Sequence, residues 1–265
     1  MYVAEIVADS LSPDDWRLTT MRLRFPRFVL AELNTHRVFS RNAASSRAIS
    51  IQTRIDEVMT DPVLPHEWGA ASRSMAATEM IAPELALKAS SAWLSARDAA
   101  IDAATAMHRL GVHKQVVNRL LEPFAWVDVI LSGTDWTSFF ALRCAPEAQP
   151  EIRHLACLMR EAYEASLPRF CQYGTWHIPL LSEEELDTIP SFQDALLIAA
   201  GRIARVSYNG RSKTIEADLE LAHRLRASGH WSPFEHVAVA SPGQHVMCHN
   251  YQHGWHQLRA MLDND

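Results

Sequence analysis

The alternation of apolar and polar residues predicts two strands near the start of the chain. In residues 1–9, Val3, Glu5 and Val7 alternate with smaller or apolar neighbours, and residues 17–25 alternate arginine and threonine with leucine and methionine. A period of two places successive side chains on opposite faces of a sheet. Residues 124–131 are rich in β-formers, and 176–181 and 237–240 are short extended segments by the same criteria.

Apolar positions at helical spacing predict most of the remaining elements. The longest is the alanine-rich segment 76–110, which Gly111 ends. Ser182, with Glu185 three residues later, has the capping-box pattern. Pro26 suits a helix start that continues to Asn34. Further helices are expected at 51–59, 113–121, 134–143, 151–166, 191–206 and 214–228. With no internal repeat and no low-complexity linker, the elements predict an α+β fold in a single compact domain, residues 1–265.

Composition narrows the class of protein. The chain has 265 residues, 48% of them hydrophobic and 21% charged, which is typical of a soluble globular protein. It has no apolar run of about eighteen residues and no signal-like N-terminus, so we expect a cytoplasmic protein without a membrane partner. A net charge of -6 argues against a general nucleic-acid binder. Neither a Gly-x-Gly-x-x-Gly nor a Walker-type loop occurs, so any dinucleotide is held without a Rossmann turn.

The four cysteines are scattered and form no Cys-x-x-Cys motif. We expect reduced thiols that pack as small hydrophobic groups. Cys144 is the one to watch, because it follows Arg143 and a nearby cation can lower a thiol pKa. Adjacency in sequence does not bring two side chains together on a helix, however.

A dense polar segment, residues 34–47, follows the apolar residues 28–31. Three arginines, one histidine, three serines and one asparagine fall within residues 36–47. Guanidinium forks with hydroxyl and amide groups suit an anion, especially a phosphate, although a solvated basic loop has the same composition. His36 and Arg37, followed by seven residues and Ser45, resemble the Arg-His-Arg signature of the flavin-dependent thymidylate synthases.

Two further blocks extend the resemblance. In residues 118–153, Leu-Arg at 142–143 precedes Ala-Gln-x-Glu-Ile at 148–152; by itself, Arg143 could be an arginine at the core margin with its charge in water. In residues 204–236, the sequence Gly-His-Trp-Ser-Pro-Phe-Glu-His at 229–236 matches seven specified positions of a family block, although a capped turn is the structural alternative. That block normally precedes the arginine-histidine motif. The order 32–47, 118–153, 204–236 therefore resembles a circularly permuted, phage-like member.

The resemblance implies a mainly antiparallel sheet with long helices, a homotetramer with shared active sites, and reductive methylation of dUMP to dTMP. FAD would be the cofactor, with NADPH and methylenetetrahydrofolate as co-substrates. In the family, the matching arginine favours ionisation of the pyrimidine at N3, which makes Arg143 the candidate catalytic residue. The resemblance assigns the flavin to His36, Arg37, Ser138 and Ser232, the folate and nicotinamide side to His230, and the nucleotide to Ser45, Arg47, Arg119 and Arg143.

Several positions depart from the family pattern. Thr35 stands where the first arginine of the signature is expected, and Arg41 could replace that charge from the same segment. Ala43 and Ala48 stand where the family has an acidic residue and a tyrosine. Glu32 replaces a glutamine that contacts the nucleotide. A carboxylate accepts but does not donate hydrogen bonds, so Glu32 could favour an amino-bearing pyrimidine such as dCMP.

Three alternatives remain open at this stage. A flavin and folate enzyme could hydroxymethylate or otherwise modify dUMP or dCMP. The fold could bind nucleotide or flavin without catalysis. A metal-binding protein could use His245, His249, His253 and His256, since spacings of four place the first three along one helical face. Against a metal site, Gly254 interrupts the segment, which we interpret as a terminal tail.

Overall fold

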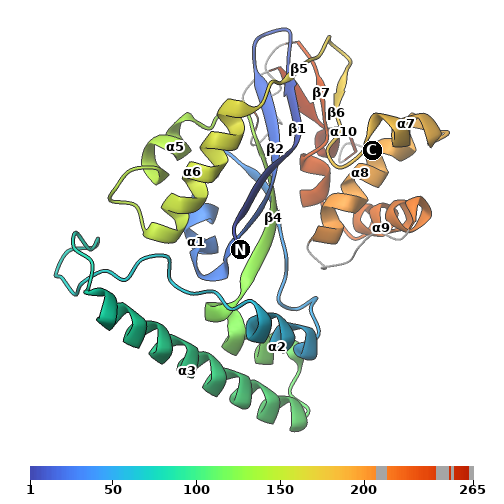
Figure 1. Ribbon diagram of the computed structural model, residues 1–265. Coiled ribbons are helices and arrows are strands. Elements are labelled where there is room, and N and C mark those ends of the chain that lie inside the picture. Colours follow the sequence, from blue (N-terminus) through green and yellow to red (C-terminus); the bar gives the residue numbers. More distant parts are fainter. Residues whose placement is uncertain (207–213, 243–250, 252–253, 263–265) are drawn as a thin grey trace.

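A five-stranded sheet runs through the middle of the molecule in the order β3-β4-β2-β1-β5 (Figure 1). The computed structural model describes residues 1–206, 214–242, 251 and 254–262. β1 and β5 are parallel and the other neighbours antiparallel, which confirms a mainly antiparallel sheet. The strands are β1 (Val3–Leu11), β2 (Arg17–Pro26), β3 (Ser40–Ala43), β4 (Trp126–Gly133) and β5 (Arg169–Phe170).

Alternation along β2 and β4 gives this sheet two buried faces. On one face, Met21, Leu23 and Phe25 pack with alternate residues of β4 against three helices, which are α1 (Leu30–Asn34), α5 (Thr137–Arg143) and α6 (Pro150–Ala165). The 3-10 helix η1 (Arg27–Val29) leads from β2 into α1. Burying large apolar side chains contributes about 1.5–3 kcal/mol each, so this layer is a major source of stability.

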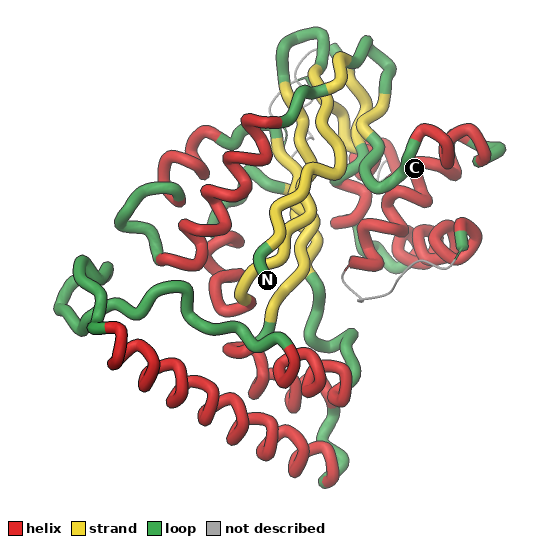
Figure 2. Tube along the Cα trace, in the orientation of Figure 1, coloured by secondary structure: helices red, strands yellow, loops and turns green. Residues whose placement is uncertain are grey.

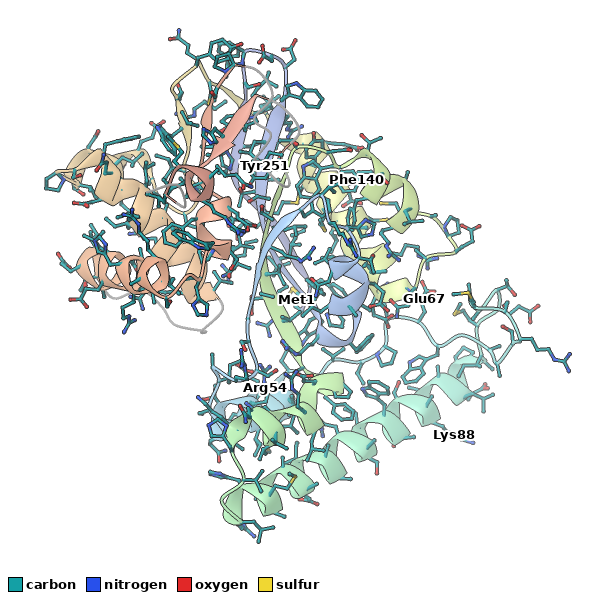
Figure 3. The ribbon with its side chains drawn as sticks, turned by 180° about the vertical axis from the view of Figure 1, so that it is seen from behind. Met1, Arg54, Glu67, Lys88, Phe140 and Tyr251 are labelled. Carbon is teal, nitrogen blue, oxygen red and sulfur yellow. The ribbon has the colours of Figure 1, made fainter. Side chains whose placement is uncertain are left out.

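The opposite face carries a second layer. Ile130 of β4 packs against α8 (Phe192–Val206) and α9 (Ile215–Ala227), while Leu18 of β2 packs with Trp255. Figure 2 shows this layer beside a three-stranded sheet, β6-β7-β8. Figure 3 labels Phe140 and Tyr251, which belong to the clusters on the two sides. The remaining elements are β6 (Trp176–His177), α7 (Glu183–Thr188), η3 (Ser232–Glu235), β7 (Ala238–Ala240), β8 (Trp255–Gln257) and α10 (Leu258–Leu262).

A helical cap closes one end of the sheet (Figure 1). Its elements are α2 (Ile51–Thr60), α3 (Pro83–Arg109), α4 (Lys114–Val117) and the 3-10 helix η2 (Asn118–Phe124). Ile55, Val58 and Leu121 are buried between them. None of the helices within the described ranges combines the length and apolar character needed to cross a membrane.

Most predicted elements are present, with informative differences at their ends. The long helix begins at Pro83 rather than at residue 76, because proline favours the first helical turn. The expected helix 113–121 divides into α4 and η2, and only 176–177 of the segment 176–181 is a strand. The interpretation of the histidine-containing segment as a terminal tail is wrong where the structure describes its end, since Trp255 is buried and β8 pairs with β7. β3, β5 and α10 were not predicted.

Candidate active site around strand β3

The basic segment 34–47 divides at β3 into two parts with different surroundings. Before the strand, residues 35–39 leave α1 through a turn. β3 then pairs with β4, from Ser40 opposite Ser132 to Ala43 opposite Val129. After it, residues 44–49 form a loop that ends at Ser50, the N-cap of α2. The strand thus fixes both parts to the central sheet.

Before β3, Arg143 joins the first and second sequence blocks. Its Nε donates to His36 Nε2 at 2.9 Å, and its Nη2 donates to Thr35 Oγ1 at 3.2 Å. Nη2 also lies 3.4 Å from the backbone oxygen of Glu32. We call these four residues the Arg143 cluster. Thr35, where the family has an arginine, here accepts a hydrogen bond from one.

The state of His36 follows from these contacts. Because Nε2 accepts a hydrogen bond, the neutral ring carries its proton on Nδ1. Partial burial and the Arg143 cation both lower the pKa of His36. Its ring packs edge-on against Phe139, with centroids 4.9 Å apart. Arg41 Nη1 donates to the His36 backbone oxygen at 3.2 Å, which places a second cation beside the turn.

After β3, the chain borders a hollow of about 330 Å³. This volume lies at the small end of the range for ligand sites, about 300–1,000 Å³. The hollow brings the first block against the third and presents guanidinium, imidazole, hydroxyl and amide groups. Its lining consists of Asn42, Ala43, Ser45, Arg47, Ala48, Ala204, Leu225, His230, Ser232 and Pro233.

Asn42 connects the two blocks, and sequence reasoning did not single it out. Its Nδ2 donates to the backbone oxygen of Ile203 in α8 at 2.7 Å, and its Oδ1 lies 3.4 Å from Ser232 Oγ. Asn42 is buried. An amide can donate to one element and accept from another. The one available signal was an uncharged amide within an otherwise basic motif.

Side chains of η2 hold the loop 44–49 from behind. Asn118, fully buried, donates to the backbone oxygens of Ser46 and Ile49 at 2.8 and 3.1 Å. Ser46 Oγ donates to Glu122 at 2.6 Å, and Arg119 donates to the same carboxylate oxygen at 2.8 Å. Ser46 points inward, whereas its neighbours Ser45 and Arg47 border the hollow. Arg119 therefore lies near this loop without lining the hollow.

A buried chain of hydrogen bonds lies behind η3. It runs from Ser10 through His177, Thr20 and Ser132 to His236, with successive distances of 2.8, 2.8, 2.6 and 2.8 Å. Burial lowers the pKa of both His177 and His236 to about 3, so both rings are neutral. Neutral imidazoles can accept and donate within the chain at low desolvation cost. The final residue of the third block is thus fixed in the interior.

The other predicted site residues lie at the surface. His230 is exposed, with Nδ1 2.9 Å from Ser228 Oγ, and Ser232 and Arg47 are exposed on the hollow. Arg37 is exposed on the turn before β3. Ser138 is exposed near the start of α5 and makes no side-chain hydrogen bond to the Arg143 cluster within the described chain.

The remaining candidate groups are less informative. Several of them lie outside the described residues: positions 207 and 208 of the third block, three of the C-terminal histidines (His245, His249 and His253), and Cys248. His256 lies on β8, opposite Val239. The described residues contain no group of three or more metal-ligating side chains. Burial and the neighbouring Cys157 thiol raise the pKa of Cys144 to about 11, so Arg143 does not activate this thiol.

Comparisons with known proteins identify the family and the fold of the chain. A family model described as thymidylate synthase complementing protein matches residues 12–169, more than half of the chain. A UMP/dUMP methylase from Streptomyces cacaoi, bound with 5-Br UMP, aligns with a TM-score of 0.52 at 15% identity, over 62% of this chain and 88% of that chain. The same methylase bound with 5-Br dUMP aligns with a TM-score of 0.46 at 15% identity, over 56% and 66%. The first alignment shows a shared fold. No curated protein matches the chain.

Proposed function

We propose that this chain, which belongs to the thymidylate synthase complementing protein family, is an FAD-dependent thymidylate synthase. The reaction is reductive methylation of dUMP to dTMP, with methylenetetrahydrofolate as carbon donor and NADPH as reductant. The observation that carries the proposal is the hollow beside β3, where Ser45 and Arg47 of the first block meet His230 and Ser232 of the third. These blocks are separated by nearly two hundred residues in sequence.

The donors around the hollow suit a nucleotide phosphate. Ser45 and Arg47 present a hydroxyl and a guanidinium, and their loop is fixed from behind by Asn118 and Glu122. A fixed loop loses little conformational freedom when an anion binds. We therefore assign the phosphate and sugar to Ser45 and Arg47. The resemblance adds Arg119, which bonds the same Glu122 oxygen as Ser46 of this loop.

The polar groups near β3 also fit a flavin. Exposed Arg37 can pair with a pyrophosphate, while Ser232 and the neutral His36 ring offer groups that hydrogen-bond a flavin ring. Ser138 and His230 are assigned to flavin and nicotinamide from the resemblance. When bound, FAD would carry the hydride from NADPH that completes the methyl group. The chain's own residues would bind the reactants and stabilise the negative charge that forms on the pyrimidine.

Arg143 is the residue assigned to the pyrimidine. Its guanidinium is half-buried, and its bonds to His36 and Thr35 fix its direction. A permanent cation held beside the ring stabilises negative charge at N3, most strongly where water is excluded. The neutral His36 ring accepts from Arg143 Nε, which a protonated imidazolium could not do.

Glu32 favours a second candidate substrate. Its Oε2 is buried and has no hydrogen-bond partner among the described residues, and its backbone contacts Arg143. A buried carboxylate oxygen without a donor costs free energy. The 4-amino group of dCMP could supply that donor, whereas the 4-carbonyl oxygen of dUMP only accepts. Competition between dUMP and dCMP for wild type and Glu32→Gln tests this role. Identical preferences would remove Glu32 from substrate selection.

The exposed position of several assigned residues supports sites shared between subunits. His230, Ser232, Arg37 and Arg47 lie at the surface of one chain, and the family forms a homotetramer in which subunits complete each site. We propose the same assembly here, in a circularly permuted chain whose third block follows the region matched by the family model.

The decisive experiment is a visible absorbance spectrum of the purified protein, with the released cofactor identified. We expect oxidised flavin bands that bleach with NADPH and dUMP, and formation of dTMP when methylenetetrahydrofolate is added. A hydroxymethylated product would select the related pyrimidine-modifying activity. A colourless protein that also fails to bind added FAD would overturn the flavin proposal.

A further inference from the structure

One carboxylate oxygen organises the loop that borders the hollow. Glu122 Oε1 accepts from Arg27 Nε at 2.9 Å, from Ser46 Oγ at 2.6 Å and from Arg119 Nη1 at 2.8 Å. These donors come from three separate elements, η1, the loop after β3, and η2. Three donors on one oxygen restrict its position more than a single ion pair does.

The surroundings keep Glu122 ionised. Burial raises the carboxyl pKa, but the hydrogen bonds from Ser46 and Arg27 and the charges of Arg27 and Arg119 together outweigh it, so the pKa of Glu122 is lowered. Arg27 Nη1 also donates to the Ala44 backbone oxygen at 2.9 Å. Glu122 and Arg27 together therefore attach the loop at Ala44 and at Ser46.

This attachment determines where Ser45 and Arg47, the residues assigned to the phosphate, lie. Ser45 and Arg47 flank Ser46, and both border the hollow because Ser46 turns inward to Glu122. Arg119 is more than half exposed, and one of its nitrogens is bound to the same oxygen. Its other nitrogens remain available to a ligand, since a guanidinium has five N–H donors.

We propose that Glu122 is a positioning residue for the nucleotide phosphate. Its Oε1 holds Arg119 at a fixed separation from Ser45 and Arg47, so that a loop and a 3-10 helix act as one anion site. This inference rests on the proposed function, because it requires a nucleotide at the hollow. It has a specific consequence: a negatively charged side chain strengthens the binding of an anion, because the geometric gain from its oxygen exceeds the electrostatic repulsion from its charge.

Two substitutions separate the effect of the Glu122 oxygen's position on dUMP affinity from the effect of its charge. Glu122→Gln keeps an oxygen acceptor at the same place and removes the charge, whereas Glu122→Asp keeps the charge and withdraws the oxygen. If position dominates, dUMP affinity falls about tenfold in Glu122→Asp and Glu122→Ala. Glu122→Gln then stays within about threefold of wild type.

Isothermal titration of the full-length protein with dUMP measures these affinities. A matched control is Glu67→Ala, which breaks the ion pair with Arg153 at a glutamate of similar exposure, 28% against 23% for Glu122. Figure 3 labels Glu67, on the loop between α2 and α3. Arg119→Ala should weaken binding about tenfold in wild type and less than about threefold in the Glu122→Ala background, because that arginine is already misplaced.

Several outcomes would overturn the inference. Unchanged or tighter dUMP binding in both Glu122→Asp and Glu122→Ala would mean that the carboxylate does not position the site. An equal loss in Glu67→Ala, or a loss that follows thermal unfolding temperature across all variants, would mean general destabilisation. Wild type that binds neither dUMP nor inorganic phosphate would overturn both this inference and the proposed function. If Glu122→Ala does not fold, the dUMP affinities of Glu122→Asp and Glu122→Gln still decide whether the carboxylate positions the site.

Discussion

The two parts of the basic segment on either side of β3 use their polar groups in different ways. Before the strand, the polar atoms bond one another within the chain, with Arg143 held by His36 and Thr35. After the strand, Ser46 turns inward to Glu122, and Ser45 and Arg47 face the hollow. One part thus has an internally paired cation, and the other has outward groups supported from behind.

This difference shows how the basic segment 34–47 can serve two purposes: it holds the Arg143 cation in place, and it presents groups that can bind a ligand. An arginine whose direction is fixed by neutral acceptors keeps its full charge, so it can act on a bound ring. Surface groups on a supported loop remain free to bond an incoming anion. Composition alone does not separate these roles, because each part contains an arginine and a hydroxyl-bearing residue, Arg37 with Thr35 before the strand and Arg47 with Ser45 after it.

The largest expected effect on turnover comes from removing Arg143, which the part before β3 holds in place. Arg143→Ala should lower turnover about a thousandfold with flavin retained, because it removes the cation assigned to N3 of the pyrimidine. It should also raise the pKa of His36 toward its ordinary value, since Arg143 is one of the two causes that lower it. Steady-state kinetics and a histidine NMR titration measure the two changes.

Arg143→Lys is the control for that experiment. A lysine keeps the charge but cannot reproduce the two directed bonds to His36 and Thr35, so we expect an intermediate rate. Normal turnover in Arg143→Ala would remove this residue from the catalytic assignment. An unchanged His36 titration would show that the pair is not formed in solution.

A second effect concerns the buried support behind η3. The unfolded chain binds protons at His177 and His236 below about pH 6.5, whereas in the folded chain these rings have a pKa of about 3. The contribution of these two rings to the free energy of unfolding should therefore be complete above pH 6.5. It should decrease as the pH falls toward 3. The slope is about 1.4 kcal/mol per pH unit for each ring.

Chemical denaturation across this pH range measures that slope. His236→Asn should reduce it by the contribution of one ring, while His223→Asn, a change at an exposed position of α9, should leave it unaltered. The same slope in His236→Asn as in wild type would contradict neutral burial of this imidazole.

The smallest expected effect distinguishes two adjacent serines, Ser45 at the hollow and Ser46 turned inward. Ser46→Ala should lower the free energy of unfolding by about 2 kcal/mol, because it removes a buried donor to an ionised carboxylate. Ser45→Ala should change it by less than about 0.5 kcal/mol and instead weaken dUMP binding. Urea unfolding and calorimetric titration distinguish the two. Equal stability losses would show that Ser45 also supports the loop.

The sequence predicted regular elements best where local forces dominate. The alternation in β2 and the capping box of Ser182 and Glu185 were both sufficient, because each depends on neighbouring residues. β3 and β8 were missed, since a strand of three or four residues is stabilised mainly by its partners. The polar residues of β3 gave no apolar alternation to recognise.

For the candidate site, the sequence alone supplied the residue types of all three blocks and the family to which the chain belongs. It did not supply Asn42, Glu122 or Ser46 as supporting residues, nor the pairing of Arg143 with His36. Those assignments depend on contacts between residues far apart in the chain, such as Ser46 with Glu122 and Asn42 with Ile203. Local sequence determines which groups are present, but only long-range packing decides which become bonded internally and which remain available to a ligand.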